Sequence, residues 1–220
     1  MGDYFDSFDV PGVVQMDNFK NIIKFKHDNS YVEIIMLLGN HDHHYMYDSP
    51  YSGYQYNFAP QIRMLLKDNL HHLRLAYQLD DLLFSHAGIS PVWCDNKLEN
   101  WTTKTLANQI NELYYTNPEA FNFQHTSFDP YGNSEDQTPI WIRPSALMSS
   151  NKGDDGLKKR FIQIVGHTVQ KDIFTSFKTS EKSMGNRYYL VDTLNSNGYV
   201  IYENKKLTPK EIEVKQMYNY

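Results

Sequence analysis

The sequence predicts an α/β fold, because segments with helical periodicity alternate with short apolar segments that end at glycine. Residues 17–26 repeat apolar side chains at helical spacing, and the mostly apolar residues 31–38 run directly into Gly39. A helix, then a strand and then a glycine loop is an order typical of α/β domains. Polar residues follow three of the predicted strands, at the edge where open α/β sheets bind ligands.

The later elements continue this alternation. Residues 59–66 are expected to form a helix with Pro60 in its first turn, and residues 73–77 and 82–84 a hairpin whose second strand leads to His86. The remaining elements, in chain order, are expected to be a helix at residues 101–113 capped by Thr102 or Thr103, a long polar loop at 124–139, a strand at 161–165 and a hairpin at 188–202.

Size and composition indicate one domain, expected to span residues 1–220. A chain of 220 residues with 40% hydrophobic residues can bury a sizeable core. Its longest apolar run is far shorter than the roughly 20 residues that cross a bilayer. The single cysteine, Cys94, excludes an internal disulfide and favours a reducing, cytoplasmic location. The net charge of −5 gives no long-range attraction, so neither membrane nor nucleic acid is expected as a partner.

Four short polar segments carry the candidate chemistry. They supply Asp3, Asn40, His86 and His167, a mixed set of oxygen and nitrogen ligands that can hold a divalent metal. A carboxylate on a tight loop, as Asp3 is, can place one oxygen on each of two metals. Each segment alone is weak evidence, but all four favour a metal site. The segments are Gly2-Asp3-Tyr4-Phe5-Asp6, Gly39-Asn40-His41-Asp42, Ser85-His86-Ala87-Gly88 and Gly166-His167-Thr168.

In this order the segments resemble the calcineurin-like metallophosphoesterases, whose pattern runs D-x-H, G-D-x-x-D, G-N-H-D/E, H and G-H. The resemblance covers residues 2–203 and implies a two-sheet sandwich flanked by helices. It also implies two divalent metals, manganese, iron or zinc, and hydrolysis of phosphate esters or anhydrides by metal-bound hydroxide. Asp3 would bridge the metals, and Asn40, His86 and His167 would complete the second metal site.

Two further segments resemble one branch of that family. Residues 85–91 are similar to the H-G-G-L-S-P segment of phosphoprotein phosphatases and diadenosine tetraphosphatases, and residues 138–144 resemble the P-L-W-x-R segment of bacterial Shewanella-like phosphatases. From the latter, Arg143 is expected to bind phosphate through its planar fork. The alternative is a surface arginine that covers Trp141. The branch's other phosphate-binding arginine is replaced by Ser7.

The expected catalytic pair is His41 and Asp6. By resemblance to the family, His41 protonates the leaving-group oxygen and Asp6 orients the imidazole. Such an Asp–His pair raises the imidazole pKa, so that the ring can carry the proton. The alternative for Asp6 is a simple turn residue. Asp42 is expected to make local loop hydrogen bonds rather than to take part in the chemistry.

The family's D-x-H motif is missing, since the sequence begins two residues before Asp3. The first strand or strands are therefore expected to be missing, and the first metal would keep Asp3 alone as a protein ligand. One metal is expected to bind tightly and a second weakly or not at all. Residues 42–44 formally read D-x-H, but Asn40 already uses this loop, so His44 is not expected to compensate. The rival interpretation is a truncated chain or a pseudoenzyme that binds phosphate without effective catalysis.

The substrate class stays open at this level. A phosphoprotein, a dinucleoside polyphosphate and a smaller phosphoester all present a phosphoryl group to the same metals. An activity like that of either a serine/threonine phosphatase or a dinucleoside polyphosphatase is compatible with the motifs. Seventeen tyrosines, several of them in residues 45–56, could stack a nucleobase, although packing of a loop is the favoured interpretation.

Overall fold

The computed structural model of the protein describes residues 1–5, 7–47, 49–125, 130–150, 157, 160–175, 188–193 and 198–211, which form a mixed α/β fold. The helices are α1 (Gly12–Asp28), α2 (Asn40–Met46), α3 (Ala59–Asp68), α4 (Pro91–Lys97), α5 (Leu106–Thr116) and α6 (Pro144–Ser150), with short 3-10 helices at Leu70–His72 and Pro118–Phe121. The strands are β1 (Met36–Leu37), β2 (Leu73–Arg74), β3 (Ala76–Leu79), β4 (Leu82–Ser85), β5 (Ile162–Val165), β6 (Phe174–Thr175), β7 (Tyr188–Leu190), β8 (Gly198–Glu203) and β9 (Lys206–Glu211).

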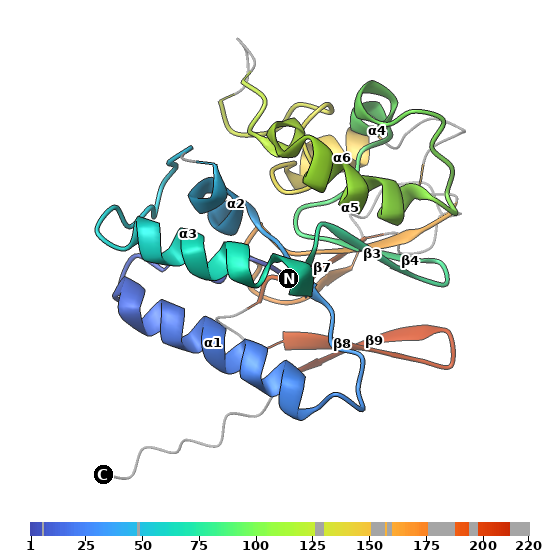
Figure 1. The fold of residues 1–220 in the computed structure, drawn as a ribbon. Coiled ribbons are helices and arrows are strands. Elements are labelled where there is room, and N and C mark those ends of the chain that lie inside the picture. Colours follow the sequence, from blue (N-terminus) through green and yellow to red (C-terminus); the bar gives the residue numbers. More distant parts are fainter. Residues whose placement is uncertain are drawn as a thin grey trace.

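The largest sheet in the described part has five strands in the order β3-β4-β5-β7-β6. The three central strands, β4, β5 and β7, are parallel, while β3 and β6 pair with them in the antiparallel sense. Strands β1 and β2 form a parallel pair, and β8 and β9 form a hairpin. Helices α4, α5 and α6 gather over one side of the five-stranded sheet, whereas α1, α2 and α3 form a separate group beside it (Figure 1).

The core joins these layers through one face of each long helix. Helix α1 buries Phe19 and Ile23, and α3 buries Ile62 and Leu66, each pair four residues apart. Residues at this spacing lie on the same side of a helix, so each helix turns one apolar stripe inward. None of the helices among the described residues is long and apolar enough to cross a membrane.

Several predicted elements are confirmed. The helix α3 and the strand β5 lie where the pattern placed them, and β3 and β4 form the expected hairpin. The first strand of that hairpin was expected at residues 73–77 but begins at Ala76, because Leu73 and Arg74 form β2 and pair with β1. Helix α1 begins earlier than expected, directly after Pro11. The strand expected at residues 31–38 shortens to Met36–Leu37. Tyr31 and Val32 are exposed, so the first part of that segment has no buried face to pair.

The prediction of a hairpin at residues 188–202 is wrong. Strand β7 pairs with β5 and β6 instead, while β8 pairs with β9. All three residues of β7 are buried, as in parallel strands covered on both faces, whereas β8 alternates between half-buried and exposed positions. Helix α5 begins at Leu106 after Thr105, not at Thr102 or Thr103.

The sheet holds the loop after β4 through one buried side chain. Gln163 in β5 accepts a hydrogen bond from the backbone N–H of Ile89 at 2.8 Å and donates its amide to the Ile89 carbonyl at 2.9 Å. Gln163 is 1% exposed. Because water cannot reach these groups, the side-chain amide replaces a strand partner and fixes the loop that follows His86.

We predict that Gln163→Leu destabilises the protein by roughly 2–6 kcal/mol, because it leaves two buried backbone groups without a partner at about 1–3 kcal/mol each. Chemical denaturation measures this loss. Gln61→Leu, on the exposed side of α3, is the matched control and should change stability by no more than about 0.5 kcal/mol. Equal stabilities of the two variants would contradict the role of Gln163.

Candidate metal centre

Asp3, Asn40, His86 and His167 come together in the structure from four separate segments. Asn40 begins α2, His86 follows β4 and His167 follows β5. The Asn40 Oδ1 atom lies 3.0 Å from His86 Nε2 and 2.9 Å from His167 Nδ1. The two ring nitrogens are 3.2 Å apart, and Asp3 Oδ2 lies 3.2 Å from His86 Nε2. The four residues selected from the sequence therefore share one small region.

The hydrogen bond of His86 Nδ1 leaves Nε2 able to bind a cation between Asp3, Asn40 and His167. Its Nδ1 lies 2.7 Å from the Met1 carbonyl, which can only accept, so Nδ1 carries the proton. In the neutral ring Nε2 then presents a lone pair to two oxygens and to the His167 nitrogen. When His167 Nδ1 is also unprotonated, the four atoms are all lone-pair donors, the set that a divalent metal ion binds.

The protonation states follow from burial and charge. Burial lowers the pKa of His86, but the adjacent Asp3 carboxylate outweighs it and holds the pKa above its ordinary value. Burial also lowers the pKa of His167, helped by His86 and Arg143, so this ring is neutral and its lone pair is free. Burial alone would raise the pKa of Asp3, yet the neighbouring imidazoles hold it below its usual value. Asp3 is therefore a carboxylate.

Two glycines allow Asp3 to approach the Asn40 loop. A Cβ at Gly39 would collide with the Asp3 carboxylate, and a Cβ at Gly2 would collide with the backbone of Gly39. Asp3 and His167 both have positive φ, 59° and 63°, a conformation that costs non-glycine residues about 1–3 kcal/mol. The fold thus holds two of the four residues in strained positions, which is common at functional sites.

Asp42 organises the same loop and does not face the centre as a ligand. Its carboxylate accepts backbone N–H groups of Asp3 at 2.8 Å, Tyr4 at 2.7 Å and Gly39 at 2.9 Å. The side chain is completely buried. These three bonds join the Asp3 turn to the start of α2, so the expectation of local hydrogen bonds agrees with the contacts observed.

The three consecutive residues 42–44 do not form a second ligand group. His43 Nε2 donates to Asn122 at 2.9 Å, and its Nδ1 accepts from the Tyr114 hydroxyl at 3.1 Å. The ring of His44 packs edge-on against Tyr45 and lies 5.4 Å from the ring of His41. Both ring nitrogens of His44 are buried and have no hydrogen-bond partner among the described residues.

Of the two expected catalytic residues, only His41 is among the residues that the structure describes. The backbone N–H of His41 donates to Asp3 Oδ1 at 3.0 Å, so His41 adjoins the centre. Its Nδ1 is buried without a partner in the part of the chain that the structure describes. Asp6, its expected partner, lies outside the described residues.

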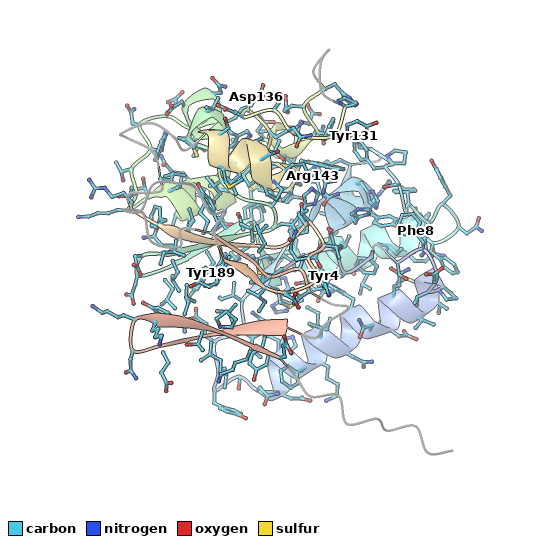
Figure 2. The ribbon with its side chains drawn as sticks, turned by 180° about the vertical axis from the view of Figure 1, so that it is seen from behind. Tyr4, Phe8, Tyr131, Asp136, Arg143 and Tyr189 are labelled. Atoms are coloured by element: carbon cyan, nitrogen blue, oxygen red, sulfur yellow. The ribbon has the colours of Figure 1, made fainter. Side chains whose placement is uncertain are left out.

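Arg143 lies at the edge of the centre, directly before α6. Its Nη1 lies 3.4 Å from the His167 carbonyl and 3.3 Å from Thr168 Oγ1, and its Nε lies 3.2 Å from the Tyr131 carbonyl. Figure 2 shows Arg143 between α6 and the N-terminal segment that carries Tyr4. The guanidinium is thus held beside His167 rather than free on the surface.

A cavity of about 170 Å³ opens beside the centre and is lined by Asp3, His86, His167 and Asp192, among others. Asp192 was not among the site residues predicted from the sequence. Its signal is positional, since it follows the first strand of the hairpin predicted at residues 188–202, as His167 follows β5. That signal was weak because a hairpin at residues 188–202 would make Asp192 a turn residue, whereas β7 pairs with β5 and Asp192 follows a central strand.

The comparisons with known proteins agree with this geometry. The model of the calcineurin-like phosphoesterases matches residues 1–171. The chain belongs to the calcineurin-like phosphoesterase family. The comparison with curated protein sequences gave no significant match.

Solved structures share this phosphoesterase fold. A cold-active protein-tyrosine phosphatase of a psychrophilic Shewanella species has a TM-score of 0.62 and 19% identity, covering 96% of this chain and 67% of that chain. A mutant cold-active protein tyrosine phosphatase gives a TM-score of 0.63 and 17% identity over 96% of this chain and 67% of that chain. At such identities the likeness shows the fold alone. The expected resemblance to Shewanella phosphatases is confirmed at that level.

We predict that the buried His43 makes the protein acid-sensitive. Burial lowers the pKa of His43 to about 4, whereas an unfolded histidine titrates near 6.5. Between these values the unfolded chain binds a proton that the folded chain excludes, so stability falls as pH drops from 6.5 toward 4, by up to about 3 kcal/mol. His43→Gln should show a smaller loss between pH 7 and pH 4.5.

Urea unfolding at the two pH values, in the presence of a chelator, measures this difference. His125→Gln changes an exposed histidine and should keep the acid sensitivity of the unmodified protein. An unchanged pH dependence in His43→Gln would show that His43 does not carry the effect.

Proposed function

We propose that the protein is a metal-dependent hydrolase of phosphoric esters or anhydrides. The observation that supports this most strongly is the convergence of Asp3, Asn40, His86 and His167, whose nearest ligand atoms lie 2.9–3.2 Å apart. The Asp3, His86 and His167 ligand atoms all lie within 4.8 Å of one another, close enough to share one ion. Membership of the calcineurin-like phosphoesterases supports the reaction class.

Each residue of the centre has a distinct task in this proposal. Asp3, Asn40, His86 and His167 would together hold a divalent cation. Manganese, iron and zinc all accept such mixed nitrogen and oxygen ligands. When bound, a divalent cation offsets phosphoryl charge and lowers the pKa of water at the site.

Arg143 would hold the phosphate. Its three observed contacts, to the backbone oxygens of Tyr131 and His167 and to Thr168, orient the guanidinium at the edge of the centre. These contacts engage Nε and Nη1, which leaves the two N–H groups of Nη2 to donate to phosphate oxygens. With Ser7 in place of the second arginine, Arg143 would be the main cationic side chain on the phosphate.

His41 would donate the proton to the leaving-group oxygen. It adjoins Asn40, its backbone N–H is bonded to the Asp3 carboxylate, and its ring is near enough to act on the charge of Asp3 and His167. The assignment of Asp6 as its partner stays a prediction, as do the two-sheet sandwich and the single domain over residues 1–220. The substrate, whether a phosphoprotein, a dinucleoside polyphosphate or a small phosphoester, also stays open.

A second candidate is a phosphate-binding pseudoenzyme without effective catalysis. It is favoured by the ligand count, because the four converging residues suffice for one cation, whereas the family's chemistry uses two. Catalytic activity of the chain therefore decides between the candidates.

The first test is metal dependence. Protein treated with a chelator and dialysed should not hydrolyse p-nitrophenyl phosphate, and added Mn²⁺ should restore turnover. The His86→Ala variant should bind metal weakly and lose turnover, because it lacks the imidazole whose Nε2 would bind the metal. His71→Ala, at an exposed histidine, is the control. Full activity of the metal-free protein would refute the proposal, and metal binding without turnover would favour the pseudoenzyme.

The second test separates metal binding from proton transfer. We predict that His41→Ala keeps its metal content but loses roughly 10²–10⁴-fold in turnover, the range typical of a lost general acid. Alkyl phosphates should suffer more than p-nitrophenyl phosphate, because a poor leaving group needs the proton. His125→Ala should change neither quantity. Equal losses with both substrates would argue against His41 as the acid.

The third test concerns Arg143. We predict that Arg143→Lys weakens inhibition by inorganic phosphate, because lysine keeps the charge but loses the planar fork. Arg143→Ala should raise KM and lower kcat together, since the fork would contact both the ground state and the transition state. Arg160→Lys, at an exposed position, should behave like the unmodified protein. Unchanged constants in Arg143→Ala would leave the arginine only as cover for Trp141.

A further inference from the structure

Strand β3 forms one edge of the five-stranded sheet in the described part of the chain, and its inner side pairs with β4 through a two-residue turn between Leu79 and Leu82. In an antiparallel pair, alternate residues direct their N–H and C=O groups to the neighbouring strand, beginning with the pair that closes the turn. Leu79 and Tyr77 therefore bond to β4. The residues between them, Ala76 and Gln78, direct their backbone groups outward.

The contacts of Asn111 in α5 agree with this direction. Asn111 Oδ1 accepts the Ala76 N–H at 3.2 Å, and its Nδ2 donates to the Ala76 carbonyl at 2.8 Å. Two residues earlier, the Arg74 carbonyl accepts the N–H of Leu38 at 2.9 Å. The next outward position is Gln78, whose backbone N–H and C=O have no hydrogen-bond partner outside the β3–β4 pairing in the described ranges.

A cavity of about 510 Å³ gives access to these open backbone groups. It is lined by Gln78, by Asn108 of α5 and by Glu33 in the segment before β1. Helix α5 lies alongside β3 and so forms one wall of the cavity (Figure 1). The volume falls in the range of ligand-binding clefts, about 300–1,000 Å³.

The sequence of β3 leaves this edge open to another strand. Natural edge strands usually carry a proline, a charged side chain or a bulge, each of which prevents another chain from pairing with them. Strand β3 reads Ala-Tyr-Gln-Leu, and its four residues pair with β4 in regular register. An extended peptide can therefore form two main-chain hydrogen bonds with Gln78 and add a strand to the sheet.

The two carboxylates that line the cavity already accept hydrogen bonds. Glu33 accepts the Tyr77 hydroxyl at 3.0 Å, and Asp80 accepts the Tyr202 hydroxyl at 3.5 Å. These contacts reduce the need of either carboxylate for a cationic ligand.

The two cations of the cavity, Arg74 and Lys104, make no ion pair with the residues that the structure describes. Arg74 donates from Nη1 to the carbonyls of His71 at 3.3 Å and Leu73 at 3.2 Å, which leaves its Nε and Nη2 groups available. A guanidinium with these groups available can bind a carboxylate through two parallel hydrogen bonds. The charges of the cavity therefore favour an acidic ligand.

We propose that the outer edge of β3 is a docking site for an extended acidic segment of a partner protein, which pairs with the Gln78 backbone and places carboxylates against Arg74 and Lys104. None of the four residues of the metal centre lines this cavity. The inference is therefore independent of the proposed phosphoester hydrolysis.

Titration with the capped peptide acetyl-Glu-Val-Glu-Val-Glu-amide, followed by nuclear magnetic resonance of the backbone amides, tests the inference. The peptide should bind at millimolar concentration or below, shift the Gln78 amide signal and slow the exchange of that amide with solvent, because an open N–H becomes hydrogen-bonded. The analogue acetyl-Lys-Val-Lys-Val-Lys-amide has the same β propensity at its valines and the opposite charge. It should bind at least about tenfold more weakly.

Two substitutions at Gln78 test the strand pairing. Gln78→Pro removes the outward N–H and leaves the bonds to β4 in place, since proline is tolerated on the open side of an edge strand. It should weaken binding of the acidic peptide at least about tenfold. Gln78→Thr keeps the N–H and is the matched control, which should bind within about threefold of the unmodified chain.

Charge reversal tests the choice of ligand. Arg74→Glu and Lys104→Glu should each weaken binding of the acidic peptide about tenfold, because each replaces a cation of the cavity by a carboxylate. Lys171→Glu, at an exposed lysine after β5, is the control and should bind as the unmodified chain does.

Three results would overturn the inference: no binding of the acidic peptide at millimolar concentration, equal binding of the lysine analogue, or full affinity in a folded Gln78→Pro variant. Should Gln78→Pro fail to fold by circular dichroism, exchange of the Gln78 amide in the unmodified chain decides. A bound peptide that leaves this exchange unchanged would refute strand pairing. Failure of the chain to hydrolyse p-nitrophenyl phosphate bears only on the proposed function, so the two failures are distinguishable.

Discussion

The centre depends on the hydrogen bond from His86 Nδ1 to the Met1 carbonyl. Because a carbonyl cannot donate, this contact at 2.7 Å fixes the ring tautomer and turns the Nε2 lone pair toward Asn40, Asp3 and His167. The lone pairs of Asn40, Asp3 and His167 then face the Nε2 lone pair, and either a proton or a metal cation among them removes the repulsion. In the absence of metal the raised pKa of His86 supplies the proton, and with metal the same atom becomes a ligand.

The rest of the local structure brings Asp3 to that ring. Asp42 gathers three backbone N–H groups, and Gly2 and Gly39 remove the side chains that would keep the two loops apart. The same contacts hold Asp3 in a left-handed conformation. Packing and hydrogen bonding thus hold Asp3 in a strained backbone conformation, which places its carboxylate beside His86.

The candidate metal-binding residues could be predicted from the sequence because their signal is local: His86 directly follows the strand β4, and His167 follows β5 after Gly166. The register of β7 could not, since strand pairing between residues far apart leaves no mark in a single sequence. Residues 188–190 therefore looked like half of a hairpin, and Asp192 was missed. Thr105 at the start of α5 was missed for a related reason, because three threonines within four residues offer equally good starts.

We propose above all that Asp3, Asn40, His86 and His167 together hold one divalent cation. Anomalous diffraction from a crystal of the chain grown with Mn²⁺ tests it most directly. We expect the strongest anomalous peak at about 2.0–2.3 Å from Asn40 Oδ1, His86 Nε2, His167 Nδ1 and an Asp3 oxygen, typical distances for oxygen and nitrogen ligands. A crystal whose strongest peak lies elsewhere, with His86 and Asn40 still in direct contact, would contradict the claim.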